Sequence, residues 1–132
     1  MNILKGEIAS LKVQGALSLV MVAVSSVRLS TIVIDTPETV SYLRVGNTVK
    51  VIFKETEVII GKGTSHNISL QNKLAGTIRS VESGEILSKL VLDTVAGEIT
   101  SIITANAVSQ LELKEGTAVT AMIKTNEIML SE

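Results

Sequence analysis

Apolar residues alternate with polar or small residues in several stretches of this chain. The stretch from Leu4 to Ser10 alternates in this way, and the stretch from Leu74 to Ser80 repeats the pattern. A period of two is that of a strand with one buried face, so both stretches are expected to be β-strands. Runs of Val, Ile and Leu predict further strands at residues 16–25, 29–34, 48–54 and 58–60, and at 86–95, 99–104, 118–124 and 128–130.

The two halves of the chain are copies of one another. Residues 2–60 align with residues 72–130 at a constant offset of 70 without a gap, and 13 of the 59 aligned positions are identical. A repeat of this kind indicates two copies of one small module. We therefore divide the chain into a first domain (residues 1–61), a linker with the opening segment of the second copy (62–71), and a second domain (72–132).

A short helix is expected between the third and fourth strands of each copy. In the first copy Thr36 can cap the helix and Pro37 suits its first position, whereas Asn106 is the expected cap in the second. The helices would end before Gly46 and Gly116. Three strands, a helix and two strands is the order of the OB-fold, so we predict an all-β protein with two tandem OB-like five-stranded barrels.

The composition of the chain excludes several kinds of site and partner. Hydrophobic residues make up 45% of the chain and aromatic residues 2%, so small aliphatic side chains must build the core, and the surplus apolar surface favours a homo-oligomer. The absence of cysteine excludes disulfides and thiolate metal sites. A net charge of −1 with scattered basic residues argues against a nucleic-acid partner. Without a long apolar span or a signal segment, we expect a cytoplasmic protein with no membrane partner.

Groups for catalysis are few, and we do not expect an enzyme. The one histidine, His66, lies in the linker without a counterpart in the other copy, and a solvated loop residue is expected there. The segment from Gly61 to Thr64 resembles a fragment of a phosphate-binding loop, but the full pattern is absent. Only Tyr42 and Phe53 could stack on nucleic-acid bases, which makes oligonucleotide binding a weak hypothesis.

The turn that joins the last two strands carries a lysine in both copies. The two turns read Lys54-Glu55-Thr56-Glu57 and Lys124-Thr125-Asn126-Glu127. A lysine followed by backbone N–H groups and by hydroxyl or amide donors is suited to an oxyanion, because a dianion needs several donors and some positive charge. On spacing alone, polar residues that simply decorate a hairpin turn are the more common arrangement.

A family resemblance strengthens the oxyanion hypothesis. Residues 97–104, 111–116, 119–124 and 128–130, with the opening segment Ser69-Leu70-Gln71-Asn72-Lys73-Leu74-Ala75-Gly76, resemble the Mop domain of molybdate-binding proteins. The first copy retains Asn2-Ile3-Leu4-Lys5-Gly6 of that opening, so the tandem pair resembles the molbindins. The resemblance implies binding, storage and homeostasis of molybdate or tungstate in the cytoplasm, through hydrogen bonds between subunits of a trimer, with no cofactor and no direct metal ligand.

The resemblance also implies a set of oxyanion-binding residues. The opening segment of one module would meet the lysine turn, and the threonine that ends the third strand, of another. The backbone N–H groups of Glu55 and Thr125 would donate, since these residues stand where the family has alanine. Carried over by position, the candidates are Asn2, Lys54, Glu55 and Thr56 in the first copy, and Ser69, Gln71, Asn72, Thr104, Lys124, Thr125 and Asn126 in the second.

Neither copy holds the full set. The family's arginine is Gln71 in the second copy and coincides with Met1 in the first, Asn126 replaces the turn serine or threonine, and Ile34 replaces the threonine after the third strand. Sites that combine the two copies could still be furnished, for example by Ser69 and Asn72 facing Lys54 and Thr56. Two alternatives stay open: an effector-sensing domain of a molybdate-responsive transcription regulator, and a structural pair of β-barrels that binds no anion.

Overall fold

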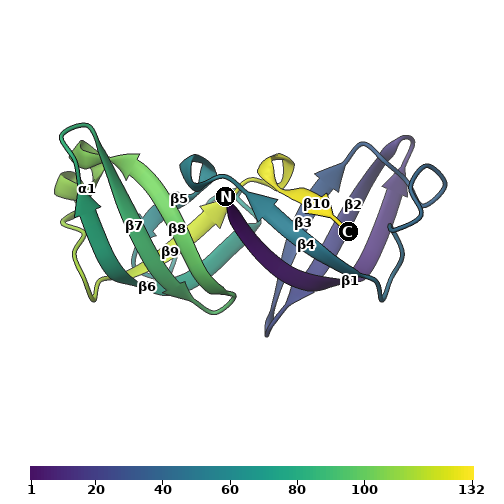
Figure 1. The fold of residues 1–132 in the computed structure, drawn as a ribbon, viewed down its shortest axis with the longest axis horizontal. Helices are drawn as coiled ribbons and strands as arrows, with labels where there is room; N and C mark the ends of the chain where they lie inside the picture. The colour runs from purple at the N-terminus through teal and green to yellow at the C-terminus, as the bar shows by residue number, and fades with distance from the viewer.

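The computed structural model describes residues 1–132 and consists of two curled five-stranded antiparallel sheets that lie side by side (Figure 1). The all-β prediction is confirmed. The first repeat forms β1 (Asn2–Gln14), β2 (Leu17–Val24), β3 (Val27–Val33), β4 (Thr48–Phe53), the 3-10 turn η1 (Glu55–Glu57) and β5 (Ile59–Lys62). The second forms β6 (Asn72–Ser83), β7 (Leu87–Thr94), β8 (Gly97–Thr104), the helix α1 (Ala105–Leu111), β9 (Ala118–Ile123), η2 (Thr125–Glu127) and β10 (Met129–Ser131).

The two repeats exchange their last strands. The strand order is β10-β4-β1-β2-β3 in one sheet and β5-β9-β6-β7-β8 in the other. Met129 of the second repeat pairs with Ile52 of the first, and Ile59 of the first pairs with Met122 of the second. Figure 1 shows β10, in yellow, beside the strands of the first repeat. The domain bounds 1–61, 62–71 and 72–132 therefore describe the sequence repeat, whereas each sheet draws strands from both copies.

The exchange follows from the backbone at the lysine turns. Lys54 and Val58, which flank η1, are both extended, with φ of −75° and −88°. A tight hairpin needs residues with positive φ, and none of the residues with positive φ lies in either lysine turn. The chain therefore continues forward from β4 to the neighbouring barrel. The prediction that the last two strands of each repeat pair through a hairpin turn is wrong.

Only the second repeat has a helix between its third and fourth strands, so the predicted first-repeat helix is absent. The N-cap of α1 is Thr104, not Asn106, and its Oγ1 accepts a hydrogen bond from the Ala107 N–H at 3.1 Å. The aligned residue in the first repeat is Ile34, which cannot cap. The residues that follow it, including Pro37, are β-branched or otherwise poor helix formers and make a single turn.

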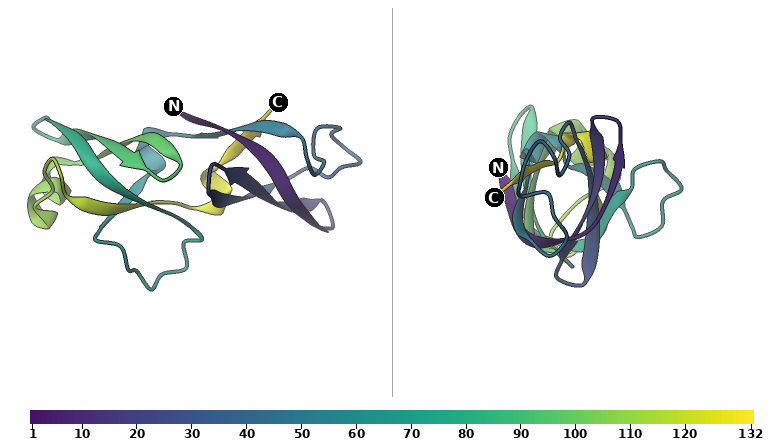
Figure 2. Two further views of the ribbon diagram at one scale, coloured as in Figure 1. Left: turned by 90° about the horizontal axis from the view of Figure 1, so that it is seen from below. Right: turned by 90° about the vertical axis from the view of Figure 1, so that its right-hand side faces the viewer.

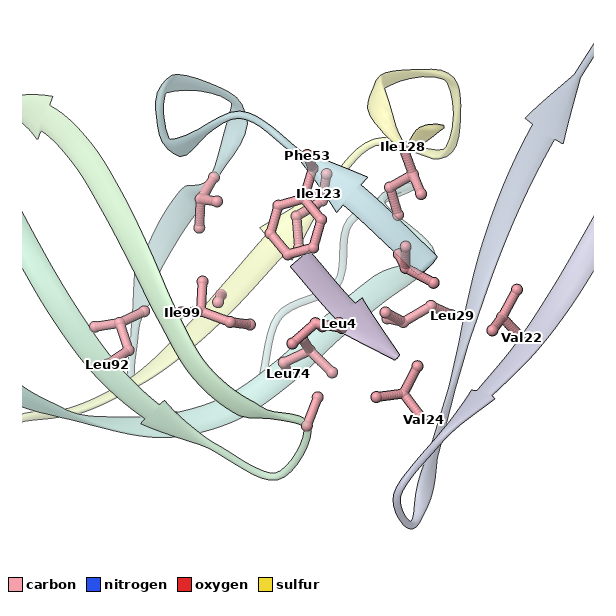
Figure 3. Packing of buried hydrophobic residues seen from close by; sticks show 14 of the residues in the cluster. Leu4, Val22, Val24, Leu29, Phe53, Leu74, Leu92, Ile99, Ile123 and Ile128 are labelled. Atoms are coloured by element: carbon pink, nitrogen blue, oxygen red, sulfur yellow. The ribbon is translucent and has the colours of Figure 1, made fainter. Parts of the chain in front are cut away.

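One hydrophobic core joins the two barrels. Twenty-two buried residues form a single cluster, and they come from both repeats. Figure 3 shows Leu4 and Leu74, and also Phe53 and Ile123, between the two sheets. Val, Ile and Leu supply most of the cluster, as the composition predicts, and Phe53 is its one aromatic member. The two barrels are thus halves of one cooperative unit.

A glycine is required inside the first strand of each repeat. A Cβ on Gly6 would lie 2.7 Å from the carbonyl oxygen of Ala23, and a Cβ on Gly76 would lie 2.7 Å from that of Asp93. Each register shifts two to four residues further on, at Ile8 in β1 and Ile78 in β6. The close approach lets the long first strand bend from one neighbour to the other.

The linker between the repeats forms a loop on one side of the molecule (Figure 2). It begins at Gly63, because Gly61 and Lys62 belong to β5. Thr120 donates to the carbonyl of Gly63 at 2.7 Å, and the Lys73 ammonium donates to that of His66 at 2.9 Å. These bonds hold the first half of the loop against the second sheet. No helix is long and apolar enough to cross a membrane.

Removal of residues 129–132 is expected to weaken the first barrel, although these residues belong to the second repeat. Without β10, one edge of β4 becomes free, and the half-buried Leu130 is lost from the core. We expect a loss of about 1 to 3 kcal/mol in the free energy of unfolding. Hydrogen exchange should show faster exchange in β4, with β9 unchanged. Faster exchange confined to β9 would contradict the exchanged topology.

Candidate functional site

Two asparagines tie the opening strand of each repeat to the third strand of the other. The Asn2 Nδ2 donates to the carbonyl of Thr100 at 2.8 Å, and the Thr100 N–H donates to Asn2 Oδ1 at 2.8 Å. Asn72 makes the same pair of bonds with Ser30, at 2.8 and 2.7 Å. Both asparagines are buried. Of the expected oxyanion-binding residues, these two serve as structural ties within the chain.

Two buried hydroxyls hold the lysine turns on the same third strands. Thr31 Oγ1 donates to the carbonyl of Ile128 at 2.8 Å and lies 3.2 Å from that of Thr125. Ser101 Oγ, at the aligned position, donates to the carbonyl of Val58 at 2.9 Å. Each lysine turn therefore sits beside the opening of its own repeat and the third strand of the other.

The first of these two groups forms an open depression. Met1, Lys54, Glu55, Thr56 and Ile102 line about 300 Å³ of it. Lys54 and Thr56 are exposed, and neither side chain makes a hydrogen bond within the chain. Glu55 Oε1 lies 2.6 Å from the ammonium nitrogen of Met1.

Electrostatics favour the charged form of the Glu55 carboxyl. The hydrogen bond from the Met1 ammonium lowers the pKa of Glu55, and so does the hydrogen bond from its own backbone N–H. The charge of Lys89 contributes in the same direction. Lys89 pairs across β7 and β8 with Ile102, which lines this depression.

Thr104 is the exposed last residue of β8. It stands two residues beyond Ile102, on the same face of β8, at about 7 Å along the strand. Its hydroxyl oxygen accepts the Ala107 N–H, and the hydroxyl proton stays available for another acceptor.

The second group is built on Lys124, Thr125 and Asn126, beside Gln71 and β3. Lys124, Asn126 and Gln71 are exposed and Thr125 is half-buried. None of the four side chains makes a hydrogen bond within the chain, so their donors are free for a ligand. Ile34 stands here in place of Thr104.

The remaining expectations concern the linker. Ser69 is exposed there, and no hydrogen bond joins Ser69 or Asn72 to Lys54 or Thr56 within one chain. His66 differs from the solvated residue that was expected. Its ring lies against Gly61 and Met122, and its Nε2 is enclosed without a partner. No three His, Asp or Glu side chains are placed to hold a metal ion.

The sequence interpretation missed the roles of Met1, Ile102 and Lys89 at the first turn. These residues come from both repeats and meet there only because the last strands are exchanged. The aligned hydroxyls Thr31 and Ser101 were also missed. The sequence did contain a signal for these two residues, since a hydroxyl residue recurs at the same buried position of both third strands.

Comparison with known proteins defines the class. The model of the TOBE domain matches residues 68–130, which is the second repeat. The molybdate-bound form of ModG, a cytoplasmic molybdate-binding protein, superposes with a TM-score of 0.91 at 28% identity, over 98% of this chain and 94% of ModG. The protein is therefore a tandem pair of OB-like barrels of the molybdate-binding type.

Relatives at higher identity define the family. Molybdenum-pterin-binding protein 3 of Clostridium pasteurianum is 37% identical over 65 residues, which are 48% of this chain and 96% of that protein. Molybdenum-pterin-binding protein 1 of the same organism is 38% identical with the same coverage. The chain belongs to this family, the Mop proteins, which are binding proteins and not enzymes.

Replacement of Asn72 by alanine tests its structural role. The change leaves the N–H and carbonyl of Ser30 without their partner in a part-buried position, which should cost about 1 to 3 kcal/mol. We expect a lower midpoint of urea unfolding. The matched control is Asn106→Ala, because Asn106 is exposed and makes no side-chain hydrogen bond. An equal midpoint in the two variants would show that the Asn72 amide does not stabilise the fold.

Proposed function

We propose that this protein binds molybdate or tungstate in the cytoplasm and stores or buffers the ion through hydrogen bonds. The observation that carries the proposal is the pair of lysine turns whose side-chain donors are unused within the chain, at Lys54 and Thr56 and at Lys124, Thr125 and Asn126. The family and the likeness to molybdate-bound ModG support the choice of oxyanion. The metal is enclosed by its own oxo ligands, so the protein needs donors and positive charge instead of metal ligands.

The site residues take two roles in this proposal. The lysine ammonium groups and the backbone N–H groups of Glu55 and Thr125 contact the oxyanion, with the hydroxyls and amides of Thr56, Thr104, Asn126, Gln71 and Ser69 as additional donors. Asn2 and Asn72 position the turns through their ties to the third strands. The proposal places Ser69 of one subunit at the lysine turn of another.

An exposed apolar face supports an assembly of several copies. Leu19 and Ile32 pair on the outer face of β2 and β3, and Leu17 and Ile34 extend this apolar face. All four side chains are exposed in one chain, Ile34 to 79%. Burial of apolar area of this kind stabilises oligomers, and we propose a homotrimer.

Ligand-dependent thermal unfolding tests the function. Molybdate or tungstate at about 100 times its dissociation constant should stabilise the protein by about 2.7 kcal/mol per site, and sulfate and phosphate should do so much less. Lys124→Met is expected to reduce the stabilisation. Lys114→Met is the control, because Lys114 is an exposed lysine outside both turns. The absence of any shift with molybdate and tungstate would refute the proposed function.

Sedimentation of the purified chain tests the assembly. The wild type should have three times the mass of one chain. Leu19→Lys and Ile34→Thr install the residues that the second repeat carries at the aligned positions, Lys89 and Thr104, and should weaken the assembly. Val45→Lys, at an exposed apolar residue of the loop between β3 and β4, should leave the mass unchanged. A monomeric wild type would rule out the trimer.

A further inference from the structure

The two lysine turns differ most at the residue that follows the lysine. Glu55 stands there in the first turn and Thr125 in the second. The backbones are alike, since both residues begin a 3-10 turn of three residues after an extended lysine. A substitution at one of these positions therefore changes side-chain chemistry within the same local frame.

Three positive groups lie at the first turn or act on Glu55. They are Lys54, Lys89 and the Met1 ammonium. The aligned residue of Lys89 in the first repeat is Leu19, which lies on β2, the neighbour of the strand that holds the second turn.

The Glu55 carboxylate already uses the Met1 ammonium and its own backbone N–H as donors. Glu55 Oε1 lies 2.6 Å from the Met1 ammonium nitrogen, and the Glu55 side chain is only 29% exposed. A carboxylate and a tetrahedral oxyanion compete for the same donors, and like charges in one site repel each other. An incoming dianion must therefore displace Glu55 or bind beside it.

We propose that Glu55 is an internal carboxylate that occupies the first lysine turn in place of an external oxyanion. The two turns then differ in their affinity for the oxyanion. The second turn, with Thr125, takes the ligand first, and the first turn binds it weakly until Glu55 moves away. This inference rests on the proposed oxyanion function and assigns Glu55 as the residue that sets the affinity of one of its sites.

Titration of the full chain with sodium molybdate in a calorimeter tests this assignment. The variants are Glu55→Thr, which copies the second turn, and Glu55→Gln, which removes the charge at nearly the same size. Each should raise the affinity of the weaker class of sites by about tenfold or more. Thr125→Glu should weaken the tighter class. The double exchange, Glu55→Thr with Thr125→Glu, should transfer tight binding to the first turn.

Amide chemical shifts identify which turn responds. Molybdate at low occupancy should perturb the N–H groups of Thr125 and Asn126 in the wild type, and those of residues 55 and 56 in the double exchange. Unfolding midpoints without ligand verify that each variant is folded. Glu55 is not part of the buried core, so the folded state should persist in all of them.

The outcomes separate this inference from the proposed function. Wild-type binding that is unaffected by both Glu55 variants would overturn the role of Glu55 and leave the function standing. Binding by the Glu55 variants without binding by the wild type would support a block by Glu55 at the first turn, but it would overturn tight binding at the second turn and refute the proposed function of the native chain. Failure of every variant to bind would refute both.

Discussion

The exchange of the last strands is the constraint on which the rest of this structure depends. β5 completes the sheet of the second repeat and β10 that of the first, so neither half has a full set of five strands without the other. The exchange also places each lysine turn on the third strand of the opposite repeat, where Thr31 or Ser101 fixes its backbone. Barrel closure, the common core and the geometry of the candidate sites follow from one change of partner at Lys54 and Lys124.

The contacts between the halves have the form of a twofold interface inside one chain. Asn2 meets Thr100 as Asn72 meets Ser30, and each of these residues aligns with its counterpart at the same offset. In a true homodimer such reciprocity is imposed by symmetry. In a single chain this reciprocity requires suitable residues at both members of each aligned pair. The asparagine ties are retained in both copies, and so are the exposed lysines of the two turns.

Much of the fold could be predicted from the sequence, because strands with one buried face have a local signature. Gly6 and Gly76 lie inside such strands, and a close backbone approach is found at both. The partner of β5 could not be predicted in this way. Ile59 pairs with Met122 in the structure, but Ile52 would offer a similar apolar surface within its own repeat. The absence of a turn-forming residue near Glu55 was the only local hint, and it is a weak one.

The first-repeat helix and the candidate site show two other features that local sequence patterns could not predict. Thr36 and Pro37 form a good start signal, and Thr36 Oγ1 accepts the Glu38 N–H, but the β-branched Thr39 and Val40 follow and only a single turn forms. The lysine turns were recognised from sequence because they recur. The pairing of Glu55 with Met1, and the charge of Lys89 beside it, depend on strands from both repeats.

The two turns illustrate what an internal repeat permits. Each turn is held by the same tie, so its backbone stays in place whatever side chain it carries. Residues at the exposed positions can therefore diverge without loss of the fold. In this chain the divergence is concerted: the turn with Glu55 is near Lys89, and the turn with Thr125 has Leu19 in the aligned place. The carboxylate at the first turn is stabilised chiefly by the Met1 ammonium of its own repeat, and the charge of Lys89 from the opposite repeat adds a smaller contribution.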